Sequence, residues 1–239
     1  VYGSREHLPF EVTPFTDLTC DRLALVLESE RDFLHYVGHI DDEGFQCSDG
    51  TLDVRSIDRV GVGSFFLNAC ASYEQGMELI RKGAIGGVVT LNDVINSGAL
   101  RVGRTMARLL DLGFPLRPAL DIARNRSIVG SQYIVVGDGN ADIAPPESLT
   151  AVRAAISELG DDEYELDLYA YPTGNAGMGT VYKPFIHENQ DTFYLNSGHV
   201  DTFRVSREEL RWFFGLEPMP IELDGSFSWS DELFDATDA

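Results

Sequence analysis

The sequence is poor in lysine, in cysteine and in long apolar runs. Only two of its 18 basic residues are lysines, Lys82 and Lys183, against 39 acidic residues and a net charge of −21. Such a charge repels phosphate backbones, so we expect no nucleic-acid partner. No apolar run approaches the ~20 residues that span a bilayer, and no segment of signal-peptide type opens the chain, so we expect no membrane partner.

Cysteine occurs three times, as Cys20, Cys47 and Cys70. The odd count, without CxxC or Cys/His ligand spacing, predicts neither a disulfide framework nor a zinc site. We therefore expect a reduced, cytoplasmic protein without a metal or another cofactor. His35 and His39 would share one face of a helix, but on a strand they lie about 13 Å apart, too far for one metal ion.

The acidic residues are spread along the whole chain, with some enrichment in the last nine positions. Spread acidity with almost no lysine is typical of cytosolic proteins of salt-accumulating archaea, whose carboxylate-rich surfaces stay soluble in high salt. We therefore expect a halophilic protein from a haloarchaeon. An apolar fraction of 44% over 239 residues can supply the core of one large domain, or of a medium domain with a small companion.

Two regions differ in their patterning, and we expect them to be two domains, residues 1–145 and 146–239. The first alternates apolar runs with amphipathic stretches, which predicts an α/β fold with a mostly parallel sheet and helices on both faces. Its expected strands are 10–13, 33–39, 64–69, 86–91 and 133–136, and its expected helices are 21–28, 72–82, 93–112 and 116–124. The second reads as a small α+β appendage, with helices at 149–159 and 206–214 and antiparallel strands at 164–171, 181–186 and 192–195.

Two residues with chemical potential end neighbouring predicted strands. His39 closes the run 33–39, and Cys70 follows the run 64–69. Because a parallel sheet carries its chemistry at the carboxyl ends of its strands, the two side chains can meet at one edge. An imidazole there can take a proton from the thiol or give one to a leaving amine. Taken alone, Cys70 could equally be a small buried apolar residue, and His39 a strand end.

Six pieces in order resemble the CHAT domains of the caspase-like cysteine peptidase group. They lie at 34–39 (LHYVGH), 66–72 (FLNACAS), 79–84 (LIRKGA), 87–90 (GVVT), 113–120 (GFPLRPAL) and 133–138 (YIVVGD). The resemblance covers roughly residues 8–140. It implies a caspase-like three-layer sandwich, here without its first strand and helix. It also implies peptide-bond hydrolysis with Cys70 as nucleophile and His39 as general acid/base.

Two positions depart from the family pattern. Family members commonly have glycine after the catalytic histidine, where its N–H joins that of the cysteine in the oxyanion hole; here this residue is Ile40, beside Cys70. Relatives that cleave after basic residues place an Asp two residues before the cysteine, where this chain has Asn68. Asn68 is therefore one candidate for a substrate pocket. Asp41 is another, since the acidic run 41–43 beside His39 could recruit or repel substrate, although such a run is more often a solvated loop.

Three functions stay open on these observations. The first is a cysteine endopeptidase that acts on a protein or peptide, as the effector of upstream sensor modules. The second is a catalytically inactive signalling or interaction module on the same scaffold. The third is a solute-binding α/β domain, which would need a pocket away from Cys70.

Overall fold

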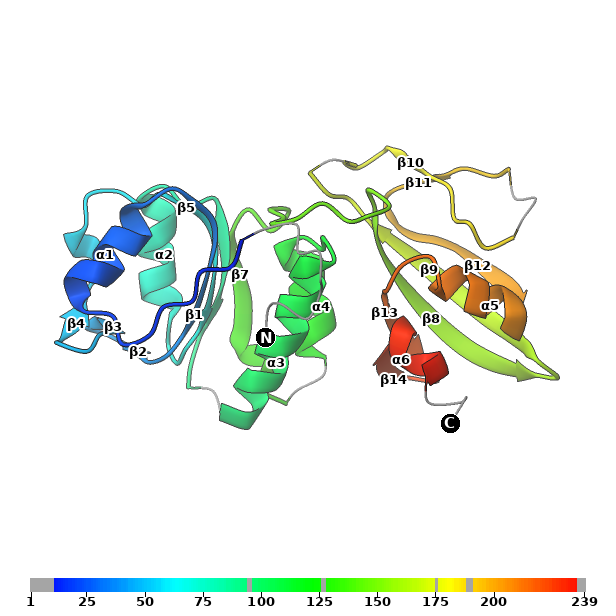
Figure 1. Cartoon of the computed structure of the whole chain (residues 1–239), viewed down its shortest axis with the longest axis horizontal. Coiled ribbons are helices and arrows are strands. Elements are labelled where there is room, and N and C mark those ends of the chain that lie inside the picture. The colour runs from blue at the N-terminus through cyan, green and yellow to red at the C-terminus, as the bar shows by residue number, and fades with distance from the viewer. Residues whose placement is uncertain (1–10, 94–95, 126–127, 175, 188–190, 236–239) are drawn as a thin grey trace. The chain divides into compact units, whose positions relative to one another are not determined.

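A four-stranded sheet forms the centre of the first part of the chain in this computed structural model, which describes residues 11–93, 96–125, 128–174, 176–187 and 191–235 (Figure 1). Its order is β1-β5-β6-β7. The pairs β1–β5 and β5–β6 are parallel, and β7 runs antiparallel to β6. The predicted α/β fold with a mostly parallel sheet is confirmed. The four strands are β1 (Arg31–Val37), β5 (Val62–Asn68), β6 (Gly86–Thr90) and β7 (Tyr133–Gly137).

Helices cover both faces of this sheet and make three layers. Figure 1 shows α1 and α2 on one side and α3 and α4 on the other. Alternate residues of β5 serve the two cores: Phe65 and Leu67 pack with α1 and α2, whereas Phe66 faces the side of Tyr133. The helices are α1 (Cys20–Glu28), α2 (Tyr73–Arg81), α3 (Asn96–Asp111) and α4 (Leu116–Arg124).

A small antiparallel sheet, absent from the sequence prediction, follows the carboxyl end of β1. It consists of β2 (Ile40–Asp41), β3 (Gly44–Gln46) and β4 (Thr51–Leu52), followed by a 3-10 turn, η1 (Val54–Ser56). The side chains of Ile40 and Phe45 are almost fully buried in the core on the α1 and α2 side. The chain beyond β1 is therefore anchored by packing as well as by backbone pairing.

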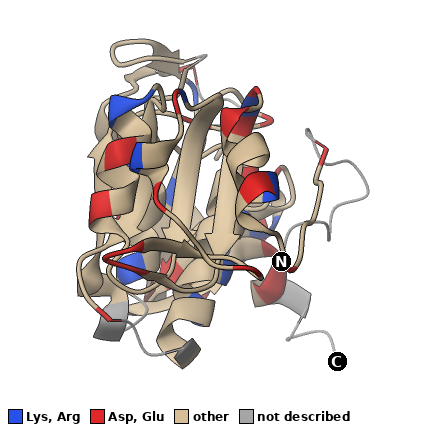
Figure 2. Cartoon of the chain, turned by 90° about the vertical axis from the view of Figure 1, so that its left-hand side faces the viewer, with Lys and Arg blue, Asp and Glu red and all other residues tan. Residues whose placement is uncertain are grey.

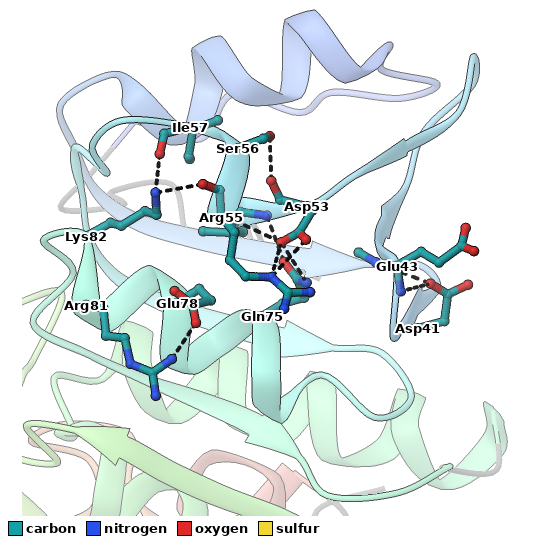
Figure 3. Close-up of polar contacts among 12 residues, drawn as sticks. Asp41, Glu43, Asp53, Arg55, Ser56, Ile57, Gln75, Glu78, Arg81 and Lys82 are labelled. Atoms are coloured by element: carbon teal, nitrogen blue, oxygen red, sulfur yellow. Dashed lines mark hydrogen bonds and ion pairs between the residues drawn. The ribbon is translucent and has the colours of Figure 1, made fainter.

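The loop around η1 is bound to α2 (Figure 3). The Gln75 side chain accepts a hydrogen bond from the Val54 N–H at 2.9 Å, and the Lys82 ammonium donates to the carbonyl oxygens of Arg55, at 3.0 Å, and Ile57. A lysine can donate several hydrogen bonds from one centre, which suits it to gathering carbonyls at a helix end. One of the two lysines of this chain thus has a structural role.

Replacement of Lys82 by methionine is expected to lower the free energy of unfolding of the first part of the chain by about 1–2 kcal/mol, because two carbonyls lose a charged donor. The control Arg81→Met removes an exposed ion pair with Glu78 and is expected to cost no more than about 0.5 kcal/mol. Both tryptophans lie beyond residue 200, so their fluorescence does not report on unfolding of the first part of the chain. We would instead measure hydrogen exchange of β5 amides. Equal losses in the two variants would contradict this role for Lys82.

Contacts divide the chain into two units. The first holds the described residues of 1–111 and 115–143, and the second holds those of 112–114 and 144–239. The second unit is built on a five-stranded sheet of order β12-β9-β8-β13-β14, with a separate two-stranded ribbon, β10–β11. Its elements are β8 (Ala151–Gly160), β9 (Glu163–Tyr171), β10 (Val181–Tyr182), β11 (Tyr194–Leu195), β12 (Gly198–Ser206), α5 (Arg207–Phe214), β13 (Pro220–Leu223), β14 (Ser226–Trp229) and α6 (Ser230–Asp235).

Two predicted elements are wrong. The helix expected at 149–159 is strand β8, in which Val152, Ala154 and Ile156 are buried at every second position and pack in the core of the second unit. Burial with period two beside β9 overrides the helical preference of the alanines. The strand expected at 10–13 is also absent: Phe10 lies outside the described residues, and residues 11–13 have no regular structure.

Charge lies mainly outside the sheet of the first unit. Figure 2 shows acidic residues over the helices and loops of the face with α1 and α2, whereas the strands behind them are largely uncharged. Within the described ranges, no helix combines the length and the apolarity that crossing a bilayer requires.

Candidate functional site

The parallel register of β1 and β5 places His39 and Cys70 at the same edge of the sheet. Val37 lies opposite Asn68, and His39 and Cys70 each follow this pair by two residues. Neighbouring strands are about 4.8 Å apart, so the two chains leave the sheet side by side. His39 is exposed and Cys70 is partly exposed, so solvent reaches both.

Cys70 lies on a tight turn between β5 and α2. The next residue, Ala71, has a φ of 47°, in the left-handed region that residues with a Cβ rarely occupy. Hydrogen bonds hold this turn: the Ala71 N–H donates to the Asn92 carbonyl at 3.3 Å, and the Thr90 hydroxyl donates to the Ala69 carbonyl. Strained backbone persists where its surroundings enforce it, and such positions concentrate at functional sites.

Helix α2 begins directly after this turn, and its start is bonded to β6. The Ser72 N–H donates to the Thr90 hydroxyl at 3.3 Å, and the Thr90 N–H donates to the Ser72 hydroxyl at 2.9 Å. The helix runs for nine residues from Tyr73, so its positive end lies just beyond Cys70. That end of a helix favours negative charge, including a thiolate.

Asn68 is buried beneath the turn, with both ends of its amide engaged. Its Nδ2 donates to the Ala99 carbonyl at 3.1 Å, and its Oδ1 accepts from the Tyr133 hydroxyl at 2.6 Å. Helix α3 packs closely here, since a Cβ on Gly103 would meet the Asn68 Nδ2 at 2.7 Å. These contacts tie the end of β5, two residues before Cys70, to α3 and β7. The expectation that Asn68 lines a substrate pocket stays a prediction.

Tyr133 belongs to this edge of the sheet, although sequence reasoning did not single it out. It pairs with Thr90 across β6 and β7, and its side chain is 1% exposed. Burial raises the pKa of its phenol, and the negative charge that Cys70 bears when ionised raises it further. The phenol hydroxyl donates to Asn68, two residues before Cys70. Only the antiparallel pairing of β7 brings it there, and no local motif signals that pairing.

The backbone of Ile40 is compatible with the predicted oxyanion hole. The Gln46 N–H donates to the His39 carbonyl at 3.0 Å, so in this antiparallel pair the Ile40 N–H points away from β3. Ile40 is not among the residues with positive φ, so its conformation does not require glycine. Its side chain, 1% exposed, is a core residue, which is a physical reason for isoleucine at this position.

Asp41 is exposed, and its carboxylate is turned onto its own hairpin (Figure 3). Oδ1 accepts from the Glu43 N–H at 2.9 Å and from the Gly44 N–H at 3.2 Å. These bonds stabilise the turn from β2 to β3, as Asp side chains commonly do. The expectation that Asp41 contacts a substrate stays a prediction.

His35 lies within β1, away from the carboxyl end of the strand, and its side chain is partly buried. Its ring stacks on Phe66, with centroids 4.7 Å apart and an interplanar angle of 20°. Burial lowers the pKa of His35 to about 4, so the ring is neutral at pH 7. Within the parts of the chain that the structure describes, no three potential metal ligands converge.

A groove of about 1000 Å³ lies along β1, the edge strand of the sheet. The segment 11–18, the whole of β1 and the turn at 46–48 line it, and His39 stands among the lining residues. Cys70 does not line it. The groove therefore reaches the histidine of the candidate pair from the side of β1 opposite β5.

No family model and no curated protein matches the sequence. Solved structures that are similar to this chain include the following two. The complex of the pro- and mature domains of Porphyromonas gingivalis RgpB has a TM-score of 0.46 and 13% identity, over 80% of this chain and 58% of that one. The Arg-specific cysteine proteinase gingipain R has a TM-score of 0.47 and 12% identity, over 88% and 57%. This chain thus spans less than three fifths of either protein.

Proposed function

We propose that the first unit is a caspase-like cysteine endopeptidase of the CHAT kind, with Cys70 as nucleophile and His39 as general acid/base. The observation that carries this proposal is the register of β1 and β5, which sets both residues two positions beyond the same paired ends. The strained turn after Cys70 and the helix start beyond it add support. Its substrate is a protein or peptide, and upstream sensor modules in a larger cytoplasmic protein control it.

The reaction would proceed by acyl transfer. The Cys70 Sγ attacks the carbonyl carbon of the scissile peptide bond, and His39 takes the thiol proton and gives it to the leaving amine. Water then hydrolyses the thioester with His39 as base. The N–H groups of Ile40 and Cys70 would donate to the oxyanion in both steps, and donors fixed in advance cost no reorganisation. The chemistry needs no metal, nucleic acid or other cofactor.

A second candidate, an inactive module that keeps this scaffold for interaction, draws on one observation. The side chains suggested for substrate recognition, Asn68 and Asp41, already bond within the protein. An enzyme would then depend on backbone groups or on other residues for its specificity. The two candidates differ in whether the Cys70 thiol reacts as an activated nucleophile.

Labelling with a peptidyl acyloxymethyl ketone in molar salt tests the first candidate, because this reagent needs an activated thiol. We expect one label per chain, located at Cys70 by peptide mass spectrometry and lost in Cys70→Ala. The matched control is Cys20→Ala, which removes another partly exposed cysteine and is expected to retain full labelling.

Labelling that persists in Cys70→Ala would contradict the proposed nucleophile. A folded wild-type chain that takes no label, while the urea-unfolded chain is alkylated at Cys70 by iodoacetamide, would favour the inactive module. The assay is repeated on the full-length parent protein, since upstream modules are part of the proposal.

A further inference from the structure

The other two cysteines lie on segments that are bonded to each other. The Cys20 N–H, at the start of α1, donates to the Asp49 Oδ1 at 2.8 Å. Two residues earlier in the chain, the Leu18 carbonyl accepts from the Ser48 N–H at 2.9 Å. The turn at 47–50 is thus held against the start of α1 by two hydrogen bonds that flank the cysteines.

Both thiols approach this turn. The Cys47 N–H donates to the Gly50 carbonyl at 2.8 Å, which closes the turn. The Cys20 Sγ is 3.7 Å from the point that a Cβ on Gly50 would occupy, so it lies over the same turn. Cys20 is partly exposed, whereas Cys47 is 9% exposed and packs in the core of the first unit. A solute can therefore reach the Cys20 thiol, whereas the Cys47 thiol is shielded in the core.

Packing also brings the two cysteines together, because Cys20 packs against the buried core cluster that contains Cys47. Burial, a hydrogen bond with the Cys47 thiol and the adjacent Asp49 carboxylate raise the pKa of Cys20 to about 12. The Cys47 thiol itself donates to the Phe45 carbonyl at 3.5 Å, and both cysteines meet at Gly50, Cys47 through its backbone N–H and Cys20 through its Sγ. The raised pKa keeps Cys20 protonated at neutral pH, so its oxidation is slow there and accelerates as the pH rises.

We propose that Cys20 and Cys47 are a redox-active pair that forms a reversible disulfide, separate from Cys70. The oxidant is a low-molecular-weight disulfide. The Cys20 sulfur, after losing its proton to solvent, attacks that disulfide and releases one thiol, which leaves a mixed disulfide on Cys20. The Cys47 sulfur then attacks Cys20, loses its own proton and releases the second thiol. The pair gives up two electrons, which reduce one small disulfide to two thiols.

The bond would link α1 to the support of His39. Gln46, directly before Cys47, holds the His39 carbonyl through its N–H, and residues 46–48 line the groove along β1. Oxidation would therefore restrict the motion of this turn and leave the hydrogen bonds around Cys70 unchanged. The proposal does not depend on the proposed peptidase activity.

The test incubates the 239-residue chain with oxidised glutathione at pH 8.5, followed by alkylation and non-reducing peptide mapping. We expect a cross-link between the peptides that contain Cys20 and Cys47, a rise in Tm of about 5–10 °C, and reversal of both by dithiothreitol. Cys20→Ser, a change at a partly exposed position, is expected to fold normally and to show neither effect. Cys70→Ala is expected to give the same cross-link as the wild type.

Three results would overturn the proposal. The first is a mixed disulfide of glutathione on Cys20 that persists without transfer to Cys47. The second is a cross-link that includes Cys70 or joins two chains. The third is a Tm that rises equally in the wild type and in Cys20→Ser. Because Cys70→Ala retains the pair, failure of the peptidase proposal leaves this test unaffected.

Discussion

Replacement of His39 by alanine is expected to slow alkylation of Cys70 by the acyloxymethyl ketone, in which the sulfur displaces a carboxylate, by about 10²- to 10⁴-fold at neutral pH, the usual contribution of a positioned acid/base group. The side chain of His39 is exposed, and its backbone carbonyl, which any residue supplies, makes the bonds to Tyr36 and Gln46. The variant should therefore keep its fold while losing the proton acceptor.

Chemical rescue separates a proton-transfer role from a structural one. Free imidazole should restore part of the labelling rate in His39→Ala, because it can occupy the space of the lost ring, and it should not affect Cys70→Ala. The matched control is His199→Ala, which removes another exposed imidazole, from the second unit, and should label at the wild-type rate. A His39→Ala variant that labels as fast as the wild type would remove His39 from the mechanism.

The elements that frame the candidate site could be predicted because each carries a local signal. Strands β1 and β5 each contain an apolar run, and the predicted bounds of helix α4, 116–124, are those of the structure. Pro115 is the N-cap of that helix, and its φ of −62° is the value to which its ring restricts it. The ends of the strands were predicted less well: β1 ends at Val37 and β5 at Asn68, so His39 follows its strand instead of closing it.

What the sequence does not reveal depends on contacts between distant residues. Strand β12 was not predicted because its exposed face is polar and its regularity comes from pairing with β9. The burial of Asn68 beneath α3 and Tyr133, and the hydrogen bond from the Cys20 N–H to Asp49, likewise join segments that no local pattern connects. Such arrangements are decided by packing of the whole unit, so a motif can name a residue without its partners.

Acid is expected to destabilise the first unit through His35. Burial lowers its pKa to about 4 in the folded protein, against 6.5 for a free side chain. As the pH falls below 6.5, His35 binds a proton in the unfolded chain, whereas in the folded chain it stays neutral until about pH 4. His35 therefore does not lower the free energy of unfolding above pH 7. Its effect lowers that free energy as the pH falls from 6.5 to 4 and stays constant below pH 4. A difference of this size corresponds to about 3 kcal/mol of stability.

Two variants isolate this group from the many carboxylates of the chain. His35→Phe keeps a ring that can stack on Phe66, and His35→Gln keeps a polar side chain; neither can take up the proton. We expect them to differ from each other in stability at pH 7.5, since their packing differs. Between pH 7.5 and 4.5, however, both should lose about 2–3 kcal/mol less than the wild type, as measured by hydrogen exchange of β5 amides in constant molar salt. The same loss in all three proteins would mean that the His35 ring can be protonated without unfolding, and that its stacking on Phe66 tolerates a charge.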